Sequence, residues 1–252
     1  MKPKPTPSAL LRYALWLGVL GTANANRKYF GLPTTWVFHI TLNSFILFLP
    51  EILQGANKVL NLDARAKQKQ DVITTAHETV QEAVVENQNY AFYAAPVALA
   101  YMVSHPRFNI YKGDLAKIRL FGFGLDAIPH SLTAFAFTNL MMDTFAAFRR
   151  HTPRDASWRT LAENADEHSG KLAGAFLIGA STLYEVGEYA IHEEELRETG
   201  GDESKINLVW SAQDTMFDIF SNTFGWIVAV TLRKRKAARP RVVDSITLGE
   251  RN

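Results

Sequence analysis

Three pairs of acidic or imidazole side chains lie at helical spacing in stretches that are otherwise apolar. Residues three or four apart share one face of a helix. Each stretch therefore predicts a helix that presents two polar groups from an apolar surface. The pairs are Asp126 with His130, Glu185 with Glu188, and Asp214 with Asp218.

These residue types suit the binding of protons or cations. Lys and Arg are nearly absent from the same stretches apart from their ends. Several carboxylates held close together cannot all stay ionised without protons or a metal. Carboxylate and imidazole ligands suit a divalent ion such as Mn, Fe, Zn, Mg or Ca. The pattern predicts a site neutralised by a metal, by protons or by a polar ligand, and a purely structural network between helices is the alternative.

The six paired residues are our candidate metal ligands, and no other cofactor is assigned. His192 lies one turn beyond Glu188, and Asn222 lies one turn beyond Asp218. The predicted supporting polar side chains are Tyr184, His192, Gln213 and Asn222.

The elements that must position these residues are six apolar segments. Several of them approach the roughly 20 residues that a helix needs to cross a bilayer. A charged group at the bilayer centre costs about 2.5–3.5 kcal/mol on insertion scales, so the polar pairs are expected to face one another inside a bundle. We predict an all-α, polytopic transmembrane helix bundle of about six spans. The segments, of which the first and third are short, are 8–22, 34–53, 90–105, 119–148, 171–192 and 206–232.

Composition divides the chain into four regions. The mean hydropathy of −0.08 is low for a protein with several membrane spans, which keeps a soluble helical bundle open as an alternative. The regions are the N-terminal membrane helices (1–53), a polar, amphipathic helical connector (54–89), a membrane bundle with the polar site (90–232) and a basic cytoplasmic tail (233–252).

Charge at the segment ends predicts the orientation. Basic residues flank the start of the chain and follow the fourth and sixth segments, as at Arg12, Arg149 and Arg233. With six crossings these clusters fall on one side, which is the positive-inside pattern. We therefore expect a multi-pass protein of the cytoplasmic (inner) membrane with both termini in the cytoplasm.

Several classes of function are excluded or disfavoured by composition and motifs. The absence of cysteine excludes disulfides, thiol nucleophiles and iron–sulfur ligation. A net charge of +2 gives no pull toward nucleic acid, so no nucleic-acid partner is expected. Phosphate-binding and zinc-protease motifs are missing. "FGFG" at 121–124 is interpreted as a packing or kink feature, because we expect no strand before it.

Three quoted stretches resemble a known family. "LDAIPHSLTAFAF", "TLYEVGEYAI" and "WSAQDTMFDIFSNTFGWIVAV" are similar, in this order, to helices of YjdF-like bacterial inner-membrane proteins. The more distant VanZ-like family shows a related pattern that ends in Asp-x-x-x-Asn-x-x-Gly, here Asp218, Asn222 and Gly225. The resemblance covers about residues 119–232. It implies a polytopic helical protein of the cytoplasmic membrane and carries over no activity.

Three functional interpretations follow. The first is an integral membrane protein of unassigned activity whose intramembrane site binds a divalent metal or a lipid headgroup. The second is a metal-assisted enzyme acting on a lipid or isoprenoid substrate, with Glu185 or Asp214 as general base. The third is an accessory subunit of a membrane complex. The expected partners are membrane lipids and other membrane proteins.

Overall fold

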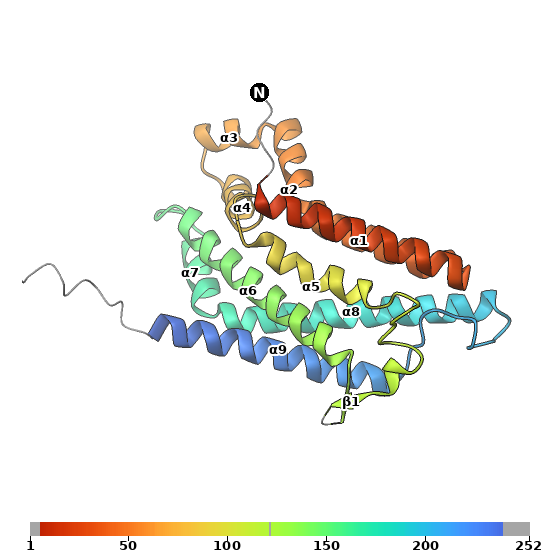
Figure 1. Ribbon diagram of the computed structural model, residues 1–252. Helices are drawn as coiled ribbons and strands as arrows, with labels where there is room; N and C mark the ends of the chain where they lie inside the picture. Colours follow the sequence, from red (N-terminus) through yellow and green to blue (C-terminus); the bar gives the residue numbers. More distant parts are fainter. Residues whose placement is uncertain (1–5, 121, 239–252) are drawn as a thin grey trace, which may run out of the picture.

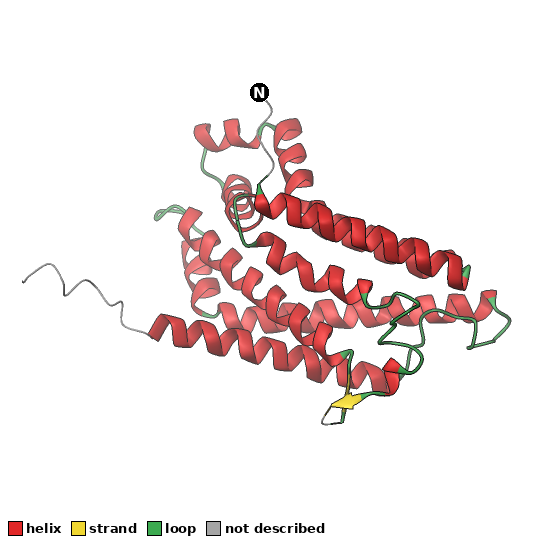
Figure 2. Cartoon of the chain, in the orientation of Figure 1, coloured by secondary structure: helices red, strands yellow, loops and turns green. Residues whose placement is uncertain are grey.

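The computed structural model describes residues 6–120 and 122–238. Almost all of this part of the chain is helical (Figure 2), which confirms the all-α prediction. In chain order the elements are α1 (Pro7–Phe30), α2 (Pro33–Leu60), α3 (Leu62–Gln68), α4 (Val72–Val80), a π-helical turn (Gln81–Val85), α5 (Tyr90–Met102), a 3₁₀ turn (Leu115–Lys117), β1 (Arg119–Leu120), β2 (Phe123–Gly124), α6 (Ala127–His151), α7 (Arg159–Glu167), α8 (Ser169–Glu198) and α9 (Ala212–Ala238).

Local sequence signals explain where the first helix begins and ends. The Thr6 side chain accepts a hydrogen bond from the Ala9 backbone N–H at 3.2 Å, and Pro7 occupies the first turn. Proline is favoured there because its missing N–H would have no helical partner. Gly31 ends the helix in the left-handed region at φ 77°, which glycine adopts without strain.

The long helices pack side by side with α6 in the middle. α6 contacts α5, α8 and α9 as well as the shorter α4 and α7. Figure 1 shows the starts of α1, α5 and α8 at the same end of the bundle as the ends of α6 and α9. One apolar core lies between α1, α2 and α5, and a smaller one lies between α6, α8 and α9. The chain therefore runs back and forth along one axis.

Two helices are long and apolar enough to cross a membrane, over Trp36–Leu60 and Ala212–Lys236. The six predicted segments correspond to α1, α2, α5, α6, α8 and α9, with shifted ends. α5 has 13 residues, and at 1.5 Å per residue it is about 20 Å long. Membrane association is thus supported by two helices, and the count of six spans stays a prediction.

The start of the fourth predicted segment is not helical. β1 and β2 form an antiparallel hairpin in which Leu120 is opposite Phe123. Gly122 has φ 89°, a conformation that favours glycine, and the last two residues of the predicted "FGFG" kink form β2. Phe121 lies outside the described residues. The expectation that no strand precedes this motif was wrong, because a tight glycine turn lets the chain pair with itself before α6 begins.

Other boundaries also differ from the predicted ones. α9 begins at Ala212, so residues 206–211 are a loop and not the start of the sixth helix. α2 continues to Leu60, beyond the predicted end at residue 53, and has Pro50 in its interior. Proline inside a helix removes one backbone hydrogen bond and bends the helix. In Figure 1 the end of α2 and α3 project from the side of the bundle.

Candidate functional site

The helices that carry the site are held together by glycines at two crossings. A Cβ on Gly225 of α9 would lie 2.1 Å from the Ser131 carbonyl oxygen of α6, so only glycine permits this close approach. Beside the crossing, the Ser131 hydroxyl donates to the Ser221 carbonyl oxygen at 3.0 Å. The α6–α9 contact fixes the relative position of the polar residues that precede it in α9.

A second crossing joins α8 to α9. The Trp226 indole N–H donates to the Gly170 carbonyl oxygen at 2.7 Å, and its ring lies over Gly174. The face of α8 that packs here is small and apolar. Further along the same helix the inward face becomes polar, with Glu185 and His192 both buried.

We call the group Asp126, His130, Glu185, Glu188, Asp214 and Asp218 the carboxylate site. The His130 Nε2 atom lies 3.2 Å from the Asp218 Oδ1 atom. The Thr215 hydroxyl donates to the Glu185 Oε2 atom at 2.6 Å. These two contacts link α6 to α9 and α8 to α9. The side chains of the three predicted helices therefore meet.

The remaining carboxylates of the site are close enough to act on Asp218 electrostatically. Asp126, Glu185, Glu188 and Asp214 all do so. Only 6% of Asp218 is exposed, whereas Asp214 is exposed, so the site runs from a buried end to an open one. Asp126 lies just before α6, and its side chain also accepts from the Ala127 backbone N–H at 2.9 Å. A like-charge cluster of this kind requires protons or a cation.

A metal-binding geometry is not found among the described residues. No three His, Asp or Glu side chains of residues 6–120 and 122–238 come together closely enough to hold a metal ion. The six candidate ligands thus share one electrostatic neighbourhood without forming a coordination shell. The side chains of Asp126, Glu185 and Asp218 instead contact separate neighbouring groups.

The supporting residues have different positions. Tyr184 is within hydrogen-bonding range of Glu188 and belongs to the site. Asn222 donates to the Ser181 hydroxyl at 3.0 Å, one turn below the carboxylates. The His192 Nδ1 atom lies 3.1 Å from the Leu208 carbonyl oxygen, so His192 binds the loop before α9. Gln213 is exposed on α9.

One residue of the site, Tyr111, was not predicted from the sequence. It lies in the loop after α5, and its hydroxyl donates to the Ala100 carbonyl oxygen at 3.0 Å. Burial of the hydroxyl, followed by the charges of Glu188 and Asp126, raises the pKa of Tyr111 well above its usual value. Part of its ring is exposed, so the residue lies at the rim. An aromatic residue in a polar loop gives no periodic signal that would have identified it.

Two further residues tie the loops beside the site. Glu195 is fully buried, and its Oε2 atom accepts from the backbone N–H groups of Asn207 and Leu208 at 2.8 and 3.0 Å. The Lys112 Nζ atom donates to the Ile206 carbonyl oxygen at 2.5 Å. Desolvation lowers the pKa of Lys112, and the charge of Glu195 opposes this change. In the sequence, Glu195 follows two other glutamates, which hides it among more exposed acidic residues, although its spacing of three from His192 continues the inward face of α8.

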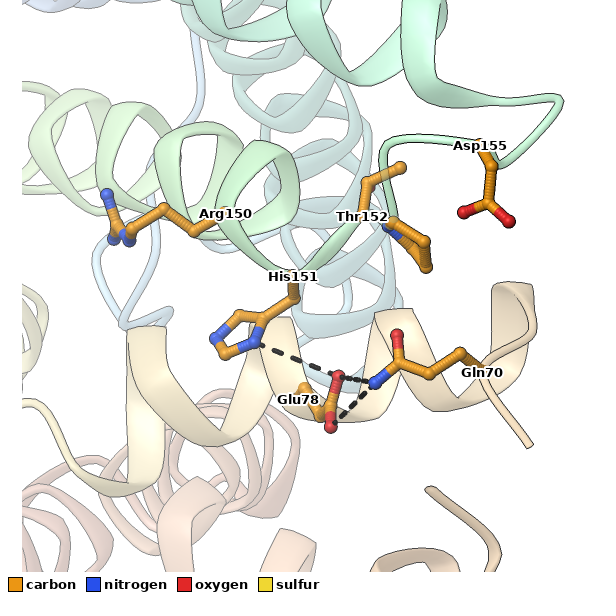
Figure 3. Close-up of a pocket in the computed structure, with 7 residues that line it drawn as sticks. Gln70, Glu78, Arg150, His151, Thr152 and Asp155 are labelled. Atoms are coloured by element: carbon orange, nitrogen blue, oxygen red, sulfur yellow. Dashed lines mark hydrogen bonds and ion pairs between the residues drawn. The ribbon is translucent and has the colours of Figure 1, made fainter. Parts of the chain in front are cut away.

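A polar pocket lies at the opposite end of α6 (Figure 3). It has a volume of about 500 Å³ and is open to solvent. Glu78 reaches toward the ring of His151, with 3.8 Å between the Glu78 Oε2 and His151 Nδ1 atoms, and also contacts Gln70. Arg150 is paired with Glu82, so the pocket has no unpaired basic group on that side. This pocket lies between the connector and the end of α6, and it does not include the carboxylate site.

A third polar contact ties α5, α6 and α9 together. Asp143 of α6 accepts from the Tyr93 hydroxyl at 2.7 Å and from the Arg233 Nη1 atom at 2.6 Å. It is the same residue type as Asp218, yet it has a basic partner. The carboxylate site differs because, among the described residues, no Lys or Arg forms an ion pair with its carboxylates, although Arg119 acts on Asp214 electrostatically.

Comparison with known proteins adds no family to this description. A scan against protein-family models finds no match, and searches of the curated proteins and of the solved structures find none either. The resemblance to YjdF-like and VanZ-like proteins therefore stays a prediction from the quoted motifs.

Proposed function

We propose that this chain is an integral membrane protein whose carboxylate site binds an organic cation, such as the ammonium group of a lipid headgroup. One observation carries the proposal. Acidic side chains from the start of α6, from α8 and from α9 act on one another in a partly buried site, where five carboxylates outnumber the one basic side chain, Arg119, that acts on Asp214. The acidic excess favours a cationic ligand.

Exposed apolar side chains support the membrane location. Large apolar residues on the outer faces of α1, α8 and α9 are open to the surroundings, among them Leu17 at 64%, Leu183 at 75% and Phe224 at 62%. Large exposed apolar patches mark sites of contact with membranes or proteins, and exposed apolar side chains recur along these helices. A hydrocarbon environment would cover them at no cost.

The proposed arrangement has six crossings, by α1, the part of α2 up to Pro50, α5, α6, α8 and α9. α5 is shorter than the roughly 30 Å hydrocarbon core, so its end must be covered by protein. It packs between α1 and α6, which supplies that cover. The basic ends of α6 and α9 then lie in the cytoplasm, together with both termini, and the carboxylate site lies toward the opposite surface.

An organic cation fits the site better than a divalent metal. A divalent metal needs several ligands converging at about 2.0–2.6 Å, and no such group exists among the described residues. An ammonium group makes longer hydrogen bonds to carboxylate oxygens that are further apart. The partly exposed ring of Tyr111 at the rim adds an aromatic surface, which attracts organic cations.

The test has two steps. Washing membranes with alkaline carbonate should leave the chain in the membrane fraction, and its release would refute the membrane location. The purified protein is then melted in detergent with tetramethylammonium chloride or with NaCl at equal ionic strength. At about 100 times the dissociation constant, a ligand stabilises by roughly 2.7 kcal/mol, which is an increase of about 5–11 °C.

A matched pair of variants shows whether the carboxylate site is responsible. Asp218→Asn keeps the side-chain shape beside His130 and removes one negative charge, so it should abolish the increase in melting temperature. Asp155→Asn changes an exposed carboxylate in the loop after α6 and should retain the increase. An equal response of both variants would refute the assignment. If the purified protein contains stoichiometric divalent metal that is lost in Asp218→Asn, the ligand of the carboxylate site is a metal ion and not an organic cation.

A further inference from the structure

The segment that projects from the bundle carries both exposed apolar and exposed basic side chains. We define the arm as residues 51–69, the end of α2 after Pro50 together with α3. Its exposed large apolar residues include Ile52 at 46%, Val59 at 79% and Leu60 at 63%. Ile52 and Val59 are seven residues apart on α2 and therefore lie on one face. These side chains are exposed within the described parts of the chain.

Basic side chains accompany this apolar face. Lys58, Lys67 and Lys69 are exposed. The nearby carboxylates of Asp71 and Asp63 are paired with other groups. The Arg65 guanidinium pairs with Asp71 at 2.8 Å, and the Asp63 carboxylate pairs with the His77 ring at 2.7 Å. Among the described residues, no ion pair holds any of the three lysines, so the arm presents a net positive charge.

The position of the arm fits a membrane surface. The end of α2 leaves the bundle sideways, near the start of α1 and on the side of the basic helix ends (Figure 1). A segment that extends sideways from a membrane-spanning bundle at this level lies along the bilayer surface. Amphipathic segments with lysines and exposed apolar residues bind there, and anionic headgroups attract the lysines.

We propose that the arm is a binding site for anionic phospholipid at the cytoplasmic surface. Val59 and Leu60 enter the boundary between headgroups and acyl chains, and Lys58, Lys67 and Lys69 bind the phosphate-bearing headgroups. This inference rests on the proposed membrane location and is independent of the ligand of the carboxylate site. It makes the arm a sensor of lipid charge, since the three lysines carry the preference.

The absence of cysteine in the sequence gives a direct test. Val59→Cys is labelled with a fluorophore, and the full chain is reconstituted into phosphatidylcholine vesicles with or without phosphatidylglycerol, each containing brominated acyl chains as quenchers. Quenching should be strong with phosphatidylglycerol and weak without it. Replacing the three lysines by glutamine should reduce the ratio of docked to free arm by about a hundredfold at roughly 1 kcal/mol each.

Two control labels separate the possible results. Leu161→Cys on α7 is similarly exposed at the same end of the bundle and should not be quenched. Phe224→Cys, on the outer face of α9, reports whether the bundle itself is in the bilayer. Quenching of the Phe224 label but not of the Val59 label refutes lipid binding by the arm and leaves the membrane location intact. This is the result expected if a protein partner covers the arm. If neither the Val59 label nor the Phe224 label is quenched, the membrane location is refuted as well. Equal quenching of the Val59 label in both lipids overturns the headgroup preference.

Discussion

Replacing Gly225 by alanine should destabilise the fold at the α6–α9 crossing. A Cβ at this position lies 2.1 Å from the Ser131 carbonyl oxygen and 3.0 Å from the Ala134 Cβ atom. Real Cβ contacts are longer than 3.0 Å, so the helices must separate by about 1 Å. Both neighbours are rigid, because one is a backbone atom and the other is attached directly to the backbone.

The magnitude follows from two opposing effects. Overpacking of a close contact costs about 1–3 kcal/mol. Alanine is a better helix former than glycine by up to about 1 kcal/mol, which offsets part of this cost. The net loss is about 1–2 kcal/mol, or roughly 2–8 °C in melting temperature for a domain of this size. Separation of the helices also lengthens the 3.2 Å contact between His130 and Asp218.

Gly179 provides the matched control. It lies in α8, and a Cβ added there meets nothing within 4 Å. Gly179→Ala should leave the melting temperature unchanged or raise it, because only the helix propensity acts. Tryptophan fluorescence of the purified protein in detergent measures both variants. A Gly225→Ala protein that melts at or above the Gly179→Ala protein would contradict the steric argument.

Three further predictions concern contacts away from the carboxylate site. Trp226→Phe removes the 2.7 Å hydrogen bond to the Gly170 carbonyl and should cost about 1 kcal/mol in a detergent melt, while a neutral result would show that water replaces the indole. Arg150 holds the pKa of Glu82 below its usual value, so the stabilisation by this pair is present at neutral pH and is lost as the pH falls below about 4.5. Glu82→Gln should flatten that part of the melting profile, and an unchanged profile would contradict the pairing. Asp143→Asn should weaken the contacts with α5 and α9 and increase proteolysis near residue 233, and unaltered cleavage would show that the pair contributes little.

The sequence predicts six of the helices from their apolar stretches but does not predict the short, polar α7, and it predicts the helix ends poorly. The hairpin before α6 depends on the turn at Gly122, and apolar residues on both sides of that glycine hide it in a hydropathy pattern. The loop before α9 depends on the buried carboxylate of Glu195, which a local pattern does not distinguish from an exposed one. The spacing of residues along one helix does not predict such contacts between residues that are distant in the sequence.

The carboxylate site was predictable in outline. Spacing of three and four residues predicts which side chains share a face. In the structure Asp218 lies beside His130, and Glu185 acts on Asp218 electrostatically. Spacing does not give the distance between helices, which the small residues at the crossings decide. The rim residue Tyr111 comes from a loop, where no periodicity applies.

The packing of α6 against the last helix has a consequence for synthesis of the chain. His130 leaves the ribosome well before its partner Asp218, with α7 and α8 made in between. Until α9 is complete, Ser131 and Ala134 have no helix covering them, and the early imidazole has no acidic neighbour from that side. A nascent chain stopped after α8 therefore leaves the α9-binding face of α6 uncovered.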